Sequence, residues 1–106
     1  MKQHTRAENL ADLIGYQDGA VVSMTLVKES SGSVTLFAFD EDQGLSEHSA
    51  PYDAMVHILD GEAEITVGGE ARTLRNGGMQ ILPANIPHAV KAHQPFKMML
   101  VMIRAD

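Results

Sequence analysis

The fold is decided by residues 54–74, which read AMVHILDGEAEITVGGEARTL. An apolar stretch ends at Asp60-Gly61, a pair typical of a turn that stops a strand. A second stretch alternates apolar and polar residues up to Gly68-Gly69, and a third begins directly afterwards. Two short β-type stretches separated by Gly-Gly indicate a tight hairpin. The sequence therefore predicts several short antiparallel strands in its middle.

The same type of pattern continues on both sides of this region. Val, Thr and Met are frequent in residues 20–27 and 33–39, and further strands are expected at 79–82 and 96–104. The only helical pattern covers residues 7–14, with Thr5 as a candidate N-cap and Gly15 as its stop, and it predicts one or two turns. Eight or nine short strands with almost no helix predict an all-β, antiparallel jelly-roll barrel or sandwich with a short N-terminal helical turn.

Length and charge limit the classes of function. A chain of 106 residues with 44% apolar residues predicts one domain over residues 1–106, with an N-terminal arm at 1–19. The net charge of −6 argues against nucleic acid and anionic membranes as partners. Cysteine is absent from the chain, so any metal must be held by nitrogen or oxygen ligands. Since no signal-peptide core or membrane-span pattern is present, we expect a cytoplasmic protein.

Two stretches combine metal-binding residue types with strand patterns: residues 44–61, GLSEHSAPYDAMVHILDG, and residues 77–90, GGMQILPANIPHAV. They resemble the two motifs of the cupin superfamily, and the resemblance covers about residues 44–92. In the second motif Gly77, Pro83 and His88 stand at the expected positions. Asn85 replaces a glycine there, and Asn is the other residue that best tolerates a positive φ.

The first motif matches in spacing but not in ligands. His48 occupies the first histidine position and Gly61 the closing glycine position, while Gly44 lies two residues too near His48. Ala50 stands where the second histidine belongs, and Ala54 stands where the glutamate belongs. We therefore expect the fold of the family with half of its usual ligand residues.

The resemblance implies a small β-barrel that holds a divalent metal, often Fe, Mn, Ni, Cu or Zn, through three His and one Glu inside the barrel. Here His48 and His88 are the expected metal ligands. Two imidazoles bind a divalent ion weakly, so a further ligand is needed. The candidates for it are His57, Asp53 and Glu47.

His57 has two possible orientations. If Ala54 points into the barrel, strand alternation points His57 to the opposite face. A β-bulge near Asp53 would instead turn His57 inward, and the residue pattern admits both arrangements. Because both faces of this strand are apolar, we also expect the outer face to be covered, most simply by a second subunit in a homodimer.

Other residues receive smaller roles. Tyr52 is a candidate proton donor at the cavity mouth, with an interface aromatic as the alternative. The methionines of residues 98–102 either fill the core or line an adaptable pocket for a small apolar molecule. His4 and His93 are expected to be exposed without a role. The acidic residues 40–42, together with Glu47, are expected to form a solvated turn rather than a calcium site.

Three functions are compatible with these residues. The first is a metal-dependent enzyme acting on a small acid, sugar or aromatic compound. The second is a metal-free module that binds or senses a small organic ligand in the barrel cavity. The third is an interaction subunit that pairs through its apolar outer sheet.

Overall fold

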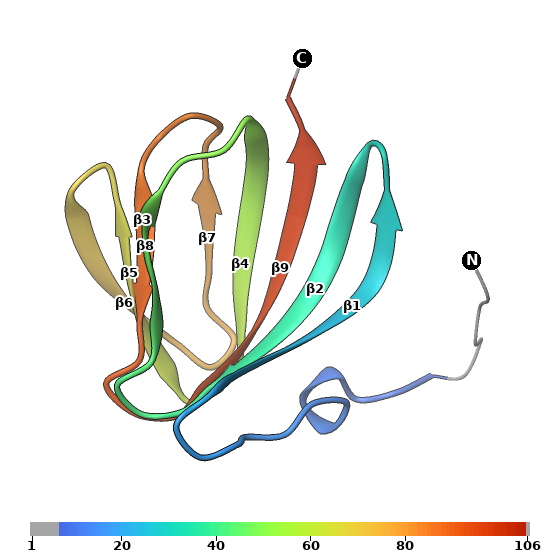
Figure 1. Cartoon of the computed structure of the whole chain (residues 1–106), viewed down its shortest axis with the longest axis vertical. Coiled ribbons are helices and arrows are strands. Elements are labelled where there is room, and N and C mark those ends of the chain that lie inside the picture. The colour runs from blue at the N-terminus through green and yellow to red at the C-terminus, as the bar shows by residue number, and fades with distance from the viewer. Residues whose placement is uncertain (1–6, 106) are drawn as a thin grey trace.

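The structure, a computed structural model that describes residues 7–105, contains two antiparallel sheets over those residues. The larger sheet has the strand order β1-β2-β9-β4-β7 and the smaller one β3-β8-β5-β6. The strands are β1 (Val21–Glu29), β2 (Gly32–Phe39), β3 (Gly44–His48), β4 (Tyr52–Asp60), β5 (Glu62–Val67), β6 (Glu70–Arg75), β7 (Met79–Leu82), β8 (His88–Lys91) and β9 (Phe96–Arg104). Figure 1 shows the fan of the larger sheet facing the smaller one. The predicted all-β, two-sheet fold is confirmed.

The glycine pairs in the middle of the chain have different roles. Gly68 and Gly69 have φ values of +58° and +84° and close the two-residue β5–β6 hairpin, as predicted. Gly61 does not close a hairpin, because β4 and β5 belong to different sheets. Its φ is +73°, and a Cβ there would lie 2.5 Å from the Pro95 carbonyl oxygen. Glycine is required where the chain crosses from one sheet to the other.

The core lies between the two sheets. Alternate side chains of β4, namely Ala54, Val56 and Ile58, are buried, because successive residues of a strand point to opposite faces. Phe39 and Phe96 are fully buried, with ring centroids 4.6 Å apart and an interplanar angle of 10°. This stacked pair fills one end of the space between the sheets.

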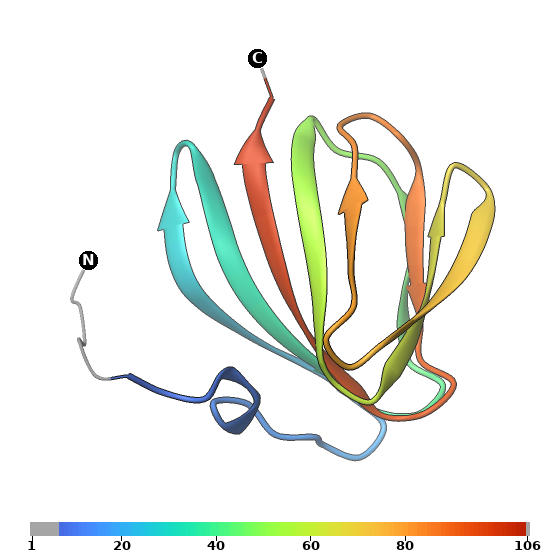
Figure 2. The ribbon, with the colours of Figure 1, turned by 180° about the vertical axis from the view of Figure 1, so that it is seen from behind.

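The N-terminal strap, residues 9–19, covers part of the outer face of the larger sheet. It contains a single 3-10 turn, η1 (Leu10–Asp12), so the short helical turn is confirmed, while the candidate cap Thr5 and the histidine His4 lie outside the described residues. Ile14 is 5% exposed and packs in one cluster with Leu36 and Ala38. Figures 1 and 2 show this segment outside the fan of strands.

Polar contacts hold the strap in place. The Tyr16 hydroxyl donates a hydrogen bond of 2.5 Å to the Asp60 carboxylate. Lys97 donates to the Ala11 carbonyl oxygen at 2.6 Å, and its ammonium lies 5.1 Å from the centroid of the Tyr16 ring. Burial, followed by the hydrogen bond to Asp60, raises the pKa of the Tyr16 phenol above its ordinary value.

The rest of this face carries an outer apolar row that the strap cluster does not include. The register aligns one residue from each strand of the larger sheet: Val27, Val34, Val101, Met55 and Ile81. Ile103 lies beside this row and is 60% exposed, and Ile81 is 51% exposed. The N-terminal strap therefore covers one part of this outer face, and the rest of the face is apolar and exposed.

No helix in residues 7–105 is long and apolar enough to cross a membrane.

Candidate functional site

The two histidines of the motif-like stretches meet across neighbouring strands. β3 pairs with β8, and His48 and His88 are register partners in that pair. Their ring centroids lie 4.4 Å apart with an interplanar angle of 64°. Two imidazoles that are 40 positions apart in the chain therefore converge at one site, as expected from the motif spacing.

A β-bulge in β3 gives His48 its orientation. Leu45 pairs with Val90 and His48 pairs with His88, so three steps along β3 match two steps along β8. In a regular strand, two residues three positions apart, such as Leu45 and His48, would point to opposite faces. With it, both side chains line the same cavity. The bulge considered near Asp53 is not present, since β4 pairs with β9 in unbroken register from Tyr52 to Ile58.

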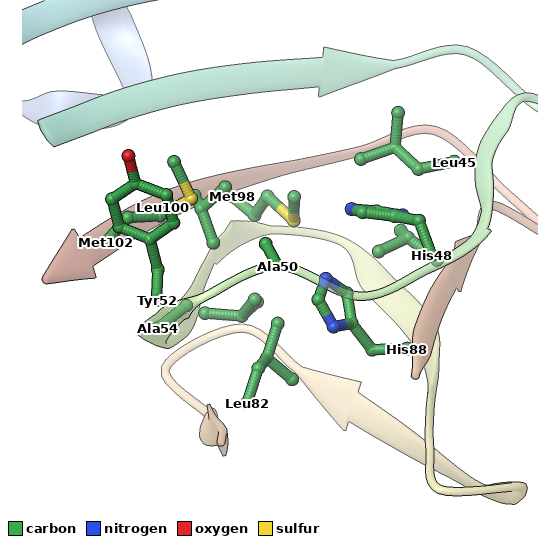
Figure 3. A pocket seen from close by; sticks show the side chains of 12 residues that line it. Leu45, His48, Ala50, Tyr52, Ala54, Leu82, His88, Met98, Leu100 and Met102 are labelled. Carbon is green, nitrogen blue, oxygen red and sulfur yellow. The ribbon is translucent and has the colours of Figure 1, made fainter. Parts of the chain in front are cut away.

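The cavity between the sheets is apolar except near the two imidazoles. It has a volume of about 50 Å³. Its remaining lining consists of Leu45, Ala50, Tyr52, Ala54, Val56, Leu82, Val90, Met98, Leu100 and Met102. Figure 3 shows both imidazoles projecting into this space, and the hydroxyl end of Tyr52 lies away from them. His48 is exposed and His88 is half-buried, which places the pair near the opening.

The methionines of β9 divide between the two faces of the sheet. Met98 and Met102 line the cavity, whereas Met99 packs on the outer side with the strap cluster. Met98 fills the core, as one of the two expectations had it, and the pocket for a small molecule stays a prediction. Strand alternation from Ala54 already places Val56 inward, whereas Leu100 was not singled out from the sequence. The alternation that makes Met98 point inward also identifies Leu100.

Each imidazole is held by a backbone carbonyl two residues earlier. The Nδ1 atom of His48 lies 2.9 Å from the Ser46 carbonyl oxygen, and that of His88 lies 3.3 Å from the Ile86 carbonyl oxygen. Burial lowers the pKa of His88, the hydrogen bond to Ile86 raises it, and the nearby His48 lowers it, with a net lowering. The folded protein therefore favours the neutral form of His88.

This lowered pKa predicts a loss of stability in acid. As the pH falls through about 6.5, the ordinary histidine value, the unfolded chain takes up a proton at His88 before the folded chain does. The free energy of unfolding is expected to fall more steeply between pH 8 and about 5.5 in the wild type than in His88→Asn. Urea unfolding at several pH values measures the slope, and His57→Asn is the matched control. Equal slopes in the wild type and His88→Asn would contradict the prediction.

The structure does not bring the other candidate ligands to this cavity. His57 lies on the opposite face of β4, where it lines a groove beside the strap, so the orientation given by strand alternation is confirmed and the inward one is wrong. The Asp53 carboxylate accepts a hydrogen bond of 2.9 Å from the Ala84 amide and holds the loop after β7. Glu47 is exposed and does not line the cavity. His93 is exposed, as expected, and lies 2.8 Å from Glu64.

The acidic turn is structural. Asp40 accepts a hydrogen bond of 2.6 Å from the Gly19 amide, and backbone hydrogen bonds lower the pKa of its carboxyl group. Asp42 has a φ of +69°, which is typical of a turn. Among the described residues no group of three or more His, Asp or Glu side chains is arranged to hold a metal ion.

The donor set of the cavity does not fit the four-ligand metal centre implied by the motif resemblance. Ala50 and Ala54, at the second histidine and glutamate positions, both line the cavity beside His48 and His88. All four motif positions thus face the cavity, but Ala50 and Ala54 offer only methyl groups and cannot bind a metal. Two imidazoles alone provide half of the protein ligands that hold a transition metal in a typical site.

Comparison with known proteins supports the same architecture. A family model described as "Cupin domain" matches residues 35–104. The chain is 35% identical to a conserved protein of unknown function from Streptococcus pyogenes, with 99% of this chain and 92% of that one covered and a TM-score of 0.93. It is 29% identical to a cupin superfamily protein from Desulfitobacterium hafniense, with 96% and 94% covered and a TM-score of 0.90.

A longer relative contains a similar unit. The chain is 40% identical to a cupin 2 conserved barrel domain protein from Leptotrichia buccalis, with a TM-score of 0.89. The match covers 92% of this chain and 47% of that one, so it spans about half of the longer protein. Among curated proteins, none matches this chain.

The backbone of Asn85 has a φ of +67°, which explains how this residue replaces the motif glycine.

Proposed function

The chain belongs to the cupin family, and from this premise we propose that it is a metal-independent binding module for a small, uncharged and largely apolar organic molecule. The observation that carries this proposal is the cavity between the sheets. It is lined by aliphatic and thioether side chains and has the two imidazoles as its polar end. Ligand sites are typically apolar pockets with a few convergent polar groups.

The size of the cavity limits its ligand. Its volume of about 50 Å³ holds a few water molecules, at 10–15 Å³ per water in this measure, rather than a bulky compound. Met98, Leu100 and Met102 line it from β9, and unbranched methionine adapts easily to the shape of a bound molecule. We therefore infer a ligand of few heavy atoms, or one admitted by movement of these side chains.

Filling the cavity tests this proposal. Ala54→Leu is expected to weaken binding of a small apolar probe such as benzyl alcohol about tenfold or more, because its extra carbons occupy the cavity. Met55→Leu on the outer face of the same strand is the matched control and leaves the affinity unchanged. Isothermal titration calorimetry on both variants measures the affinities. A probe that binds Ala54→Leu as tightly as the wild type does not occupy this cavity.

The metal-dependent enzyme is separated from this proposal by metal stoichiometry. Elemental analysis of protein incubated with Zn, Mn, Fe, Ni or Cu and then desalted is expected to give far less than one equivalent, since only His48 and His88 are available in the cavity. Near one equivalent of a single metal, lost in His48→Ala/His88→Ala, would favour the enzyme instead.

The outer apolar row of the larger sheet also favours a homodimer that forms through this face. Val27, Val34, Val101, Met55 and Ile81 form one line across the larger sheet, and this line is continuous with the exposed Ile103. We infer that a second copy packs on this row, because a two-fold axis lets the same apolar surface serve both subunits.

Introducing a charge on this face tests the homodimer. Ile103→Lys is expected to weaken dimerisation about tenfold or more, because the ammonium group loses water at the interface without a partner. Glu70→Gln on β6 changes the net charge by the same amount outside the row and is the matched control. Sedimentation equilibrium measures both variants. A wild-type protein that is monomeric at micromolar concentration would contradict the inference.

A further inference from the structure

The hydrogen bonds of the two imidazoles fix which ring nitrogen is available. A backbone carbonyl oxygen only accepts hydrogen bonds, so the Nδ1 atoms that face the Ser46 and Ile86 carbonyls carry the proton. In a neutral imidazole the other nitrogen then has a lone pair and no hydrogen. His48 and His88 therefore each present an Nε2 acceptor.

The cavity has little to satisfy these acceptors. Within the described chain, neither Nε2 atom has a hydrogen-bond donor, since the hydrogen bonds of these rings are those from Nδ1 to the two carbonyls. Apart from the two imidazoles, the Tyr52 hydroxyl is the polar side-chain group in the lining, and it lies away from them (Figure 3). The pair lies near the opening, where water can donate to these acceptors, so a molecule that displaces this water must bring a donor of its own to keep them satisfied.

The cavity lining contains no charged side chain, and this favours a neutral donor group on the ligand over a charged one. No Asp, Glu, Lys or Arg is among the twelve residues that line the cavity. An ammonium group would lose its water without an opposite charge, and a carboxylate would face two lone pairs. A neutral hydroxyl group on an apolar body matches both the acceptors and the aliphatic wall.

We propose that this cavity selects small hydroxyl compounds, alcohols or phenols, whose O–H group donates to the Nε2 atom of His48 or His88 while the apolar body packs between the sheets. This inference rests on the proposed ligand-binding function and names its ligand class. No bond is made or broken and no metal ion is required. The selection depends on a donor, so an isomer that only accepts hydrogen bonds binds more weakly.

Two pairs of constitutional isomers test this selection: benzyl alcohol with anisole, and butan-1-ol with diethyl ether. The members of each pair have the same atoms and differ in whether the oxygen carries a hydrogen. Calorimetric titration at pH 8 in buffer with a metal chelator is expected to show about fivefold tighter binding of the alcohol, the usual net effect of one hydrogen bond. Two independent isomer pairs separate the donor from the shape of the body.

Phenylalanine variants assign the preference to the imidazoles. His48→Phe and His88→Phe keep a ring of similar size and remove the acceptor. The ratio of the alcohol affinity to the ether affinity is expected to fall to roughly 1 in whichever single variant removes the histidine that accepts the hydrogen bond, and also in the double variant. His57→Phe, on the other face of β4, is the matched control and keeps the full ratio. His48 is exposed, so His48→Phe provides a folded comparison if His88→Phe unfolds.

Each outcome is decisive for one of the two proposals. Equal binding of both isomers to the wild type overturns the hydroxyl selection and leaves the apolar binding function standing. No binding of either isomer, even near its solubility limit, overturns both. A preference seen only without chelator points to a metal ion and overturns the metal-free inference. A preference that survives in His48→Phe/His88→Phe removes the imidazoles as its cause.

Discussion

Restoring the two missing ligands, through Ala50→His together with Ala54→Glu, is expected to convert the cavity into a metal centre. Both alanines line the same space as His48 and His88, so the new side chains start from positions that face the existing imidazoles. Four-ligand zinc sites bind with about 10–16 kcal/mol, or roughly 3 kcal/mol per ligand. Two added ligands are therefore expected to tighten divalent-metal binding by at least ~100-fold.

Elemental analysis after desalting measures this gain. The double variant is expected to retain close to one equivalent of zinc or manganese, and the wild type far less. Without metal the variant is expected to be less stable than the wild type, because Ala54 is only 7% exposed and a carboxylate there is buried. Addition of metal should raise its melting temperature.

Two controls make this experiment specific. His57→Ala in the double-variant background is expected to leave the stoichiometry unchanged, since His57 lies on the other face of β4. Removing His48 or His88 in the same background should lower it. A folded double variant that retains no metal would show that positions 50 and 54 do not converge with the imidazoles.

Phe39→Ala is expected to destabilise the protein by about 3–5 kcal/mol. The Phe39 ring is fully buried and stacked on Phe96, so its removal leaves a cavity at the closed end of the core. Small domains typically have only about 5–15 kcal/mol of stability, so this loss removes a large share of it and the variant is expected to unfold at a clearly lower urea concentration. Urea denaturation with a shared m-value measures the difference.

Phe37→Ala is the matched control for this substitution. Phe37 is adjacent in β2 on the same face, but it is only partly buried, and its ring lies 5.8 Å from that of Phe39. Phe37→Ala is expected to lower the free energy of unfolding clearly less than Phe39→Ala does, because less apolar surface returns to water. Similar costs for the two variants would indicate that the core is not centred on the Phe39–Phe96 stack.

The strands that the sequence predicts are those with strong local patterns. β4 and β9 carry alternating or continuous apolar residues, and the β5–β6 hairpin carries its Gly68-Gly69 signal. β3 and β8 were not predicted as strands. β3 is short, and its last three residues are exposed, while β8 has four residues directly after Pro87. β3 depends on pairing with β8, and β8 pairs with both β3 and β5, and no local pattern reports such long-range contacts.

The same limit applies to the candidate site. The convergence of His48 and His88 was predictable from the motif spacing, and strand alternation gave the correct face for His57. The route by which His48 turns inward was not predictable, because a bulge depends on the register between strands rather than on local residue types. The same alternation puts Asp53 on the face of His57, and the structure adds that the Asp53 carboxylate accepts a hydrogen bond from the Ala84 amide.

The bulge in β3 has a consequence for how this barrel diverges among relatives. Because the bulge absorbs one extra residue between Leu45 and His48, a relative without that residue would have a regular strand there and would still place its histidine on the same face, opposite the β8 histidine. The placement of the imidazole thus tolerates a difference of one residue in this strand, as long as the pairing with β8 is kept. Relatives that keep both histidines but lack one residue before the first of them are therefore expected to retain the same imidazole pair at the cavity.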